Sequence, residues 1–214
     1  MTNVLPPNPK SIPACGCASD GGVLDAGYLF VQLAEVLLRA AKSNYVGNLT
    51  RAAEILIDSL ASGKKLLVFG NGGSAADAEH IAAELIVRFK ARRRALPAIA
   101  LTSGSAIMTA CANDFCYEDV FARQIEALGS PGDVAMGIST SGRSPNVLKA
   151  IACARLRGLR TILLTGPQEL GEAVSCELIL QAPGASTATI QEVHLASYHA
   201  ICGLVDERFS REEA

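Results

Sequence analysis

The chain has 214 residues, of which half are hydrophobic, and its 19 basic and 21 acidic side chains give a formal net charge of −2. This size fits one α/β domain with an added helical segment, and the near-neutral charge argues against a nucleic-acid-binding surface. No apolar run reaches the ~18 residues of a membrane span. Seven cysteines, an odd number, without a secretory pattern favour a reduced, cytoplasmic protein. We therefore expect neither a membrane nor a nucleic acid among its partners.

The first part of the chain is predicted to be a tail followed by two helices. Residues 1–22 contain prolines and small polar residues, so we expect a disordered tail, with the folded domain at residues 23–214. Apolar residues recur at helical spacing at about 23–43 and 48–62, and the second helix would stop at Gly63. Two helices before the first strand cannot connect parallel strands. They need another surface to cover, and an oligomer interface is the natural one.

Strands and helices alternate from residue 65 onward. Apolar segments predict five strands, at about residues 65–70, 98–102, 133–139, 160–165 and 177–181. Helices are predicted between and after them, at about residues 74–90, 105–112, 117–128, 145–157, 168–175 and 187–209. The alternation indicates an α/β fold with a doubly wound, five-stranded parallel sheet and helices on both faces. The run Arg92-Arg93-Arg94 is predicted to be a solvated loop.

The loop after the first predicted strand, residues 70–74, reads Gly-Asn-Gly-Gly-Ser and leads into a helix. Its glycines allow positive φ and a close approach of the backbone to a ligand, and Ser74 is suited to be the helix N-cap. Free N–H groups at such a helix start bind an anion or a sugar hydroxyl. Further on, His80 and Glu84 share a helix face at i,i+4 spacing. That spacing suits either an acid/base or metal pair or an ordinary surface contact.

The loop after the third predicted strand carries four hydroxyl side chains, Ser139, Thr140, Ser141 and Ser144. Pro145 is suited to the first position of the next helix, whose N–H groups and dipole point toward the same place. Such a loop predicts a phosphate-binding site without a Walker lysine, and the alternative is an ordinary serine-rich turn. Its place at the carboxyl edge of the sheet, where such folds bind ligands, favours the phosphate site.

Several segments, in this order, resemble the SIS (sugar isomerase) domain and, within it, the phosphoheptose isomerases. They are Phe69–His80, Ala112–Phe115, Gly137–Gly142 and Ile190–His194, and the resemblance extends from about residue 24 to the end. It implies the flavodoxin-like SIS fold with N-terminal helices, and an isomerase that converts sedoheptulose 7-phosphate to D-glycero-D-manno-heptose 7-phosphate. That reaction begins bacterial heptose biosynthesis, the carbohydrate metabolism that supplies lipopolysaccharide. The resemblance also implies a homotetramer and, in at least some members, one zinc ion per subunit.

The resemblance assigns roles to individual residues. Glu84 would be the base and His199 the acid/base of an aldose–ketose isomerisation through an enediol, which needs one group at the carbon and another at the oxygens. The substrate-binding residues would be Asn71, Gly72, Gly73, Ser74, Glu84, Arg88, Asn113, Asp114, Ser139, Thr140, Ser141, Ser144 and Gln191. The metal ligands would be His80, Glu84, Gln191 and His199, all N and O donors that zinc accepts. His194 is predicted to be structural.

A non-catalytic SIS protein that regulates by binding a phosphosugar is the alternative function. Such regulators lack the catalytic Glu and the second His, so the presence of Glu84 and His199 favours the enzyme. A sugar-phosphate-sensing domain would come with a DNA-binding module, and no segment indicates one. Arg143, Thr189 and Cys116 depart from the family's usual residues, which leaves fine substrate preference open.

The spacing of Gln191 and His199 bears on the assembly. They lie eight residues apart in one predicted helix, ~12 Å along its axis, whereas ligand atoms on one zinc ion lie within about 4 Å of each other. Either Gln191 precedes the regular helix, or a neighbouring chain supplies one of the two ligands. We favour a site shared between subunits, because the two N-terminal helices offer apolar surface for such an assembly.

Overall fold

The computed structural model describes residues 25–171 and 175–211, so the tail expected at residues 1–22 lies outside the described residues. Its strands are β1 (Leu66–Gly70), β2 (Ala98–Ala100), β3 (Val134–Ser139), β4 (Arg160–Thr165) and β5 (Leu178–Gln181). Its helices are α1 (Ala26–Ala41), α2 (Tyr45–Ala61), α3 (Gly73–Ile86), α4 (Ser105–Asp114), the 3₁₀ turn η1 (Tyr117–Asp119), α5 (Ala122–Leu128), α6 (Pro145–Leu156) and α7 (Thr187–Ser210). Within the described ranges, none of these helices combines the length and apolarity needed to cross a bilayer.

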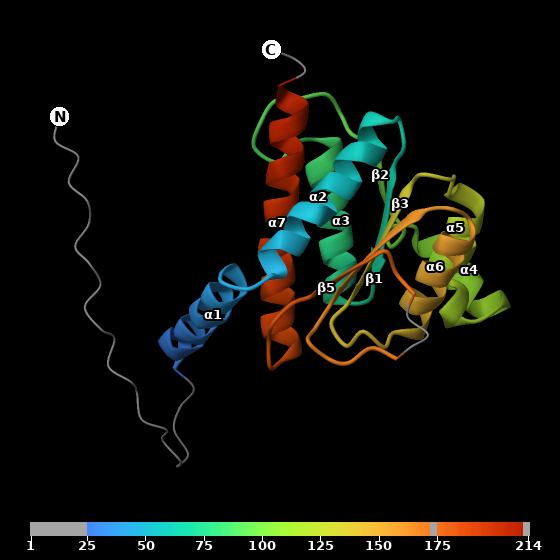
Figure 1. Cartoon of the computed structure of the whole chain (residues 1–214). Coiled ribbons are helices and arrows are strands. Elements are labelled where there is room, and N and C mark those ends of the chain that lie inside the picture. Colours follow the sequence, from blue (N-terminus) through green and yellow to red (C-terminus); the bar gives the residue numbers. More distant parts are fainter. Residues whose placement is uncertain (1–24, 172–174, 212–214) are drawn as a thin grey trace.

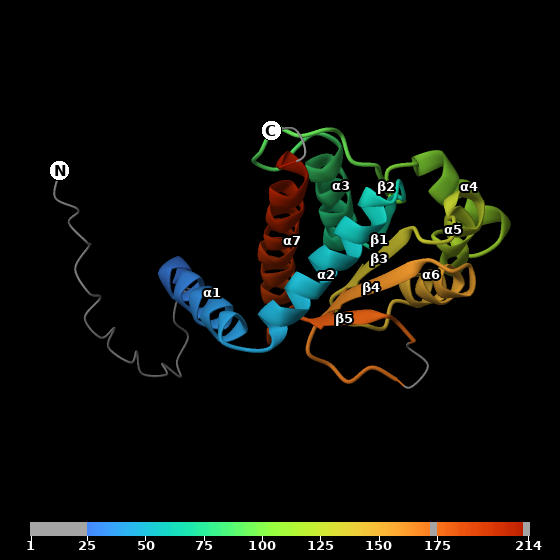
Figure 2. The ribbon, with the colours of Figure 1, turned by 45° about the horizontal axis from the view of Figure 1, so that its top comes forward.

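All five strands pair in parallel, in the order β2-β1-β3-β4-β5 (Figures 1 and 2). This is the flavodoxin-like order of a doubly wound sheet, so the fold class predicted from the sequence is confirmed. The strand order reverses between β1 and β3, which pair from Leu66↔Val134 to Gly70↔Ile138. The loops that follow these two strands therefore leave the sheet side by side, at the point where such sheets bind ligands.

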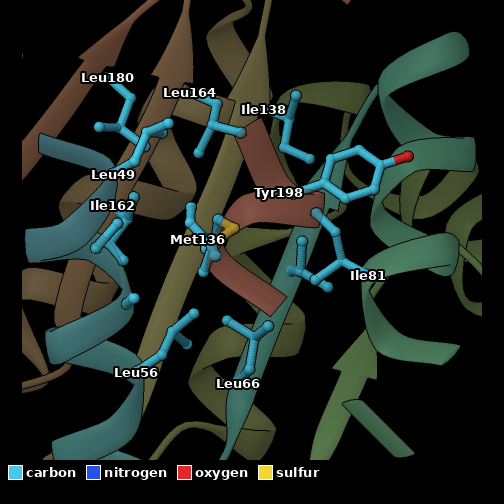
Figure 3. Close-up of a cluster of buried hydrophobic side chains, with 14 of the residues drawn as sticks. Leu49, Leu56, Leu66, Ile81, Met136, Ile138, Ile162, Leu164, Leu180 and Tyr198 are labelled. Atoms are coloured by element: carbon cyan, nitrogen blue, oxygen red, sulfur yellow. The ribbon is translucent and has the colours of Figure 1, made fainter. Parts of the chain in front are cut away.

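Two layers of helices cover the sheet. Figure 2 shows α2, α3 and α7 on one face and α4, α5 and α6 on the other. Successive side chains of β1 alternate between the layers, with Leu66 and Val68 in the first core cluster and Leu67 and Phe69 in the second. In Figure 3 the ring of Tyr198 packs against the first cluster, and its hydroxyl points out of that cluster toward α3. A strand buried on both faces is continuously apolar, which is why the sequence pattern located β1.

Helix α1 makes a narrow contact with the rest of the molecule. Val36 and Ala40 are its buried residues, whereas the side chains of Tyr28, Phe30 and Leu38 are 50%, 76% and 59% exposed. Figure 1 shows α1 projecting away from the sheet, beside one end of α7. An exposed apolar face of this kind suits contact with another protein surface.

Two predicted helices take a different form. Among residues 168–171 and 175, the described part of the helix expected at residues 168–175, there is no helical turn. Gly171 disfavours a helix there, and the carbonyl oxygen of Gln168 instead accepts a hydrogen bond from Gln181 Nε2 at 2.9 Å. The helix expected at residues 117–128 is divided into η1 and α5.

The basic run after α3 is not the solvated loop that the sequence predicted. Helix α3 ends at Ile86, and the side chain of Arg93 folds back under it with no exposed surface. The guanidinium donates to the carbonyl oxygens of Glu84 and Leu85, which are last-turn acceptors of the helix. The prediction was therefore wrong for Arg93, because this cation takes the place of water at the end of α3.

Candidate active site

The chain leaves β1 through a glycine turn. Gly72 has φ of +57°, which glycine adopts without strain, and it is the N-cap of α3. Ser74, which was predicted to be the N-cap, is instead buried in the first turn, where its N–H donates to the Asn71 carbonyl at 3.0 Å. A Cβ at Gly73 would lie 2.0 Å from Gln191 Nε2, so any side chain there would have to displace the Gln191 amide. The turn therefore places two residues without side chains, Gly72 and Gly73, at the start of α3.

The hydroxyls of the loop after β3 converge. Ser139 Oγ donates to Ser144 Oγ at 3.0 Å and lies 3.4 Å from Ser141 Oγ. The N–H of Arg143 donates to Ser141 Oγ at 3.2 Å, and Thr140 is partly exposed. Ser144 is also the N-cap residue of α6, and its side chain makes no capping hydrogen bond. Hydroxyl groups and free N–H groups at a helix start are donors of the kind that an anion such as phosphate accepts.

An amide pair joins the two loops. Asn71 Nδ2 donates to Asn146 Oδ1, and Asn146 Nδ2 donates to Asn71 Oδ1, each at 2.9 Å. The hydroxyl of Tyr117 also donates to Asn71 Oδ1, at 3.0 Å. Sequence reasoning singled out Asn71 and missed its two partners. The available signal was their position: Asn146 is the second residue of α6, directly after the serine-rich loop, and Tyr117 closely follows Asp114.

A second cluster lies between α3 and α7. His80, Glu84 and His199 each offer one ligand atom, and these three atoms lie within 4.8 Å of one another. His80 Nε2 lies 2.9 Å from Glu84 Oε1, and the rings of His80 and His199 meet edge-on with their centroids 5.1 Å apart. All three residues are partly exposed, so a ligand can reach them. Helix α7 thus adds His199 as a third group beside the His80/Glu84 pair of α3.

Tyr198 orients one imidazole of this cluster, and sequence reasoning missed it. Its hydroxyl lies 2.9 Å from His80 Nδ1 and donates to Asp77 Oδ1 at 3.4 Å. Burial, together with the Asp77 carboxylate, raises the pKa of Tyr198, so the phenol stays protonated and donates. The other ring nitrogen, Nε2, lies 2.9 Å from the Glu84 carboxylate, so each nitrogen of His80 has an oxygen partner and the ring is held in one orientation.

The second imidazole is held against an aromatic ring. Phe89 stacks on His199 with ring centroids 5.1 Å apart and an angle of 26° between the planes. Burial and the neighbouring His80 lower the pKa of His199. A neutral imidazole has one N–H donor and one acceptor nitrogen, so His199 can both give and take a proton.

Gln191 lies apart from the three clustered residues. It is inside α7 rather than before it, so the first of the two arrangements expected for Gln191 and His199 is excluded. Its amide contacts Gly73, the first residue of α3, whereas His80 lies seven residues later, ~10 Å along the helix axis. One chain thus brings together three of the four predicted metal ligands.

The remaining predicted site residues lie at exposed helix ends. Arg88 follows α3, and Asn113 and Asp114 end α4, where Asn113 Nδ2 donates to Asp114 Oδ1 at 2.9 Å. His194, predicted to be structural, is fully buried, and its Nε2 lies 3.2 Å from the Thr165 carbonyl oxygen.

Known proteins share this architecture. Residues 30–166 match the family model of the SIS domain. The chain is 50% identical over 172 residues to the phosphoheptose isomerase of Geobacter sulfurreducens, a match that covers 80% of this chain and 91% of that relative. The solved phosphoheptose isomerases from Neisseria gonorrhoeae and Francisella tularensis give TM-scores of 0.76 and 0.80 at 37% and 32% identity. Each of these two matches covers 85% of this chain and 96% of the other.

Proposed function

Since the chain belongs to the phosphoheptose isomerases, a family of SIS-domain enzymes, we propose that it converts sedoheptulose 7-phosphate to D-glycero-D-manno-heptose 7-phosphate. The observation that carries this proposal is the cluster of His80, Glu84 and His199, an acid/base set whose ligand atoms lie within 4.8 Å. The converging hydroxyls of the loop after β3 support a phosphorylated substrate. The enzyme would act in the cytoplasm, at the start of the heptose synthesis that supplies lipopolysaccharide.

Glu84 and His199 divide the proton transfers between them. Isomerisation moves a proton between C1 and C2 of the sugar through an enediol, so it needs a base at the carbon and an acid/base at the oxygens. Glu84 is the base, since its carboxylate is accessible and the contact with His80 at 2.9 Å holds it in one orientation. His199 serves the oxygens, because its lowered pKa keeps the imidazole neutral, with one donor and one acceptor nitrogen.

The two polar loops hold the other end of the sugar. Ser139, Ser141 and Ser144 bind the phosphate together with the N-terminus of α6. Asn71 presents an amide of fixed orientation, since Asn146 holds both of its polar atoms. Phosphate binding at this edge positions the reacting carbons, which is how remote binding energy serves the chemical step.

The clustered residues also fit a zinc ion, and we propose one per subunit. Their donor atoms are two imidazole nitrogens and one carboxylate oxygen, a set that zinc accepts in catalytic sites with a further open position. When bound, the ion would polarise the substrate carbonyl as a Lewis acid.

We propose a homotetramer in which a neighbouring subunit completes the site. Gln191, the fourth ligand implied by the family resemblance, contacts Gly73 in its own chain, two turns of α3 from His80. A neighbouring chain would therefore supply it, and the exposed apolar face of α1 supports such an assembly.

Subunit mixing tests the shared site. Inactive Glu84→Gln subunits exchanged with inactive Gln191→Ala subunits should regain part of the activity, because some sites then receive both intact residues. Glu84→Gln mixed with His199→Ala should stay inactive, because those two residues lie in one chain. If hetero-oligomers of the first mixture form and their activity stays at background, Gln191 and Glu84 act in the same chain. The shared site would then be wrong.

The function itself is tested by incubating the purified protein with sedoheptulose 7-phosphate and detecting the aldose product. Turnover is expected in the wild type and its loss in Glu84→Gln. Binding of the sugar phosphate without turnover would instead favour the alternative function, a regulatory SIS protein.

A further inference from the structure

A buried ion pair lies behind the acid/base cluster. Arg93 Nε donates to Asp206 Oδ1 at 2.7 Å, and the two side chains are 0% and 4% exposed. Arg93 comes from the segment after α3, and Asp206 from the last turns of α7. Two ions this deeply buried need further hydrogen bonds to replace their lost hydration, and both have them.

Arg93 binds the end of α3 at the backbone of the proposed base. Its Nη2 donates to the carbonyl oxygen of Glu84 at 2.7 Å, and its Nη1 to those of Leu85 and Arg94 at 2.8 and 2.9 Å. Carbonyl groups at a helix C-terminus carry partial negative charge and lack partners within the helix, so a guanidinium is a favourable cap. The hydrogen bond from Arg93 therefore helps to fix the backbone position of Glu84.

Asp206 binds the segment that carries the aromatic neighbour of His199. Its Oδ2 accepts the N–H groups of Lys90 and Ala91 at 2.7 and 2.9 Å, and these residues directly follow Phe89, which stacks on His199. Asp206 itself lies seven residues beyond His199 on α7, two turns further along. The ion pair therefore links α3, α7 and the segment between them, which together hold the cluster.

We propose that Arg93 and Asp206 are positioning residues of this isomerase, which hold α3 against α7 so that Glu84 and His199 face the same substrate atoms. The proposal rests on the proposed function, because it concerns the reaction of that site. Displacing a catalytic group by about 1 Å can cost ~10²-fold in rate.

Arginine is suited to this position and lysine is not. One planar guanidinium here binds the Asp206 carboxylate and three carbonyl groups at once, whereas an ammonium is a single point charge. A lysine at position 93 would keep the charge and lose part of this set of contacts. The conservative variant therefore separates the role of the charge from the role of the geometry.

A second ion pair provides a matched control. Lys65 Nζ lies 2.6 Å from Asp133 Oδ2, and Asp133 also accepts the N–H groups of Lys65 and Ser130 at 3.0 and 2.8 Å. Like Asp206, Asp133 is a buried carboxylate that binds one cation and two backbone N–H groups. It precedes β3, so it lies at the opposite edge of the sheet from the polar loops.

The test compares Arg93→Lys and the double variant R93M/D206L with Lys65→Arg and K65M/D133L, all in the full-length chain. Replacing a whole buried pair by apolar residues usually preserves folding. For each variant, kcat and KM for sedoheptulose 7-phosphate are measured well below its melting temperature. We expect kcat to fall ~10-fold or more in both Arg93 variants, with KM nearly unchanged because the phosphate loop is intact. The Lys65 variants should keep the kcat of the wild type.

A spectroscopic measurement tests the proposal apart from turnover. The chain has three histidines, and His194 binds the Thr165 carbonyl, away from the ion pair. In the metal-free protein, the imidazole ¹⁵N resonances of His80 and His199 therefore report on the cluster, and those of His194 serve as an internal reference. Arg93→Lys should shift the signals of His80 and His199 and leave His194 in place, and Lys65→Arg should leave all three.

An unchanged kcat in Arg93→Lys would overturn the proposal. Equal losses of kcat in the Arg93 and Lys65 variants would also overturn it, because both pairs would then act as general structural supports. Absence of turnover in the wild type would refute the proposed function instead. In that case the imidazole spectra alone would test the positioning role of the Arg93–Asp206 pair. Unshifted His80 and His199 signals in Arg93→Lys would then overturn the proposal.

Discussion

Asp133 and Asp206 meet the same physical requirement at two different places in the molecule. Each is a buried carboxylate that binds one cationic side chain and two backbone N–H groups. Asp133 connects the starts of two adjacent strands, since Lys65 precedes β1 and Asp133 precedes β3. Asp206 connects two helices and the segment between them. The two carboxylates therefore make the same kinds of hydrogen bonds but connect different elements, two strands in the first case and two helices in the second.

This difference indicates which geometry depends on each pair. β1 and β3 are already held by a parallel ladder along their length, so the Lys65–Asp133 pair adds stability to an arrangement that the backbone determines. Helices such as α3 and α7 have no such ladder between them and pack through side chains, so a buried ion pair can contribute to their alignment. A lysine that is 25% exposed suffices for the first task, whereas the second uses an arginine with no exposed surface. Ion pairs of similar chemistry thus serve stability between two strands and site geometry between two helices.

The largest effect is expected at the site itself. Glu84→Gln keeps the size of the side chain and removes its ability to accept a proton at neutral pH, so kcat should fall ~10²–10⁴-fold. Asp133→Asn is the control and should keep the kcat of the wild type at a temperature where it is folded. Steady-state assays of both variants check this, and a wild-type kcat in Glu84→Gln would remove Glu84 from the role of base.

Stability should distinguish the two carboxylates next. Asp206→Ala leaves the fully buried Arg93 unpaired and should cost about 3–5 kcal/mol in the free energy of unfolding. Asp133→Ala should cost less, about 2–3 kcal/mol, because Lys65 is 25% exposed and can turn to water. Urea unfolding of both variants measures the difference. A larger loss for Asp133→Ala would contradict the comparison.

A smaller effect is expected in the loop after β3, which we propose binds the phosphate. Ser144→Ala removes one hydroxyl from the converging set, and a hydrogen bond to a charged group contributes about 1.5–3 kcal/mol. Binding of sedoheptulose 7-phosphate should weaken accordingly, with kcat much less affected. Calorimetric titration with the phosphorylated sugar and with sedoheptulose checks the assignment, and equal weakening for both ligands would argue against a phosphate contact.

The smallest effect is expected along the pH axis. Burial alone would raise the pKa of Asp133, but the Lys65 ammonium and N–H and the Ser130 N–H hold it below its ordinary value of 3.8. A carboxylate with a lowered pKa in the folded state contributes stability above about pH 3.8, and this contribution is lost as the pH falls through the folded-state pKa. Asp133→Asn should therefore be less stable than the wild type at neutral pH and approach it in acid. A difference that stays constant into acid would contradict this pKa shift.

Local sequence patterns were sufficient to predict most of the fold. The continuously apolar strands, the glycine turn at residues 70–74 and Pro145 each act within a few residues of chain, and the structure places β1, α3, β3 and α6 close to the predicted segments. The helix expected at residues 168–175 was predicted from weak local preference. There, a tertiary hydrogen bond from Gln181 and the presence of Gly171 outweigh it.

The partners of the site residues could not be predicted in the same way. Asn146 lies 75 residues from Asn71, Tyr198 lies 118 residues from His80, and Asp206 lies 113 residues from Arg93. Each of these contacts exists because the sheet order brings distant segments together, and no pattern within one segment encodes it. The family motifs named the polar residues that would meet the ligand. The residues that orient them became visible only in three dimensions.

The amide pair between Asn71 and Asn146 bears on chemical ageing. Asn71 precedes Gly72, and an asparagine before glycine readily loses ammonia because the unhindered backbone nitrogen of the glycine can attack the side-chain carbonyl. Here both polar atoms of the Asn71 amide are engaged by Asn146, and Tyr117 adds a third bond, so the carbonyl is restrained from turning toward that nitrogen. Were deamidation to occur, a carboxylate oxygen would face Asn146 Oδ1, and two acceptors would repel each other where a donor now binds. The network that fixes the orientation of the Asn71 amide should thereby also slow its deamidation.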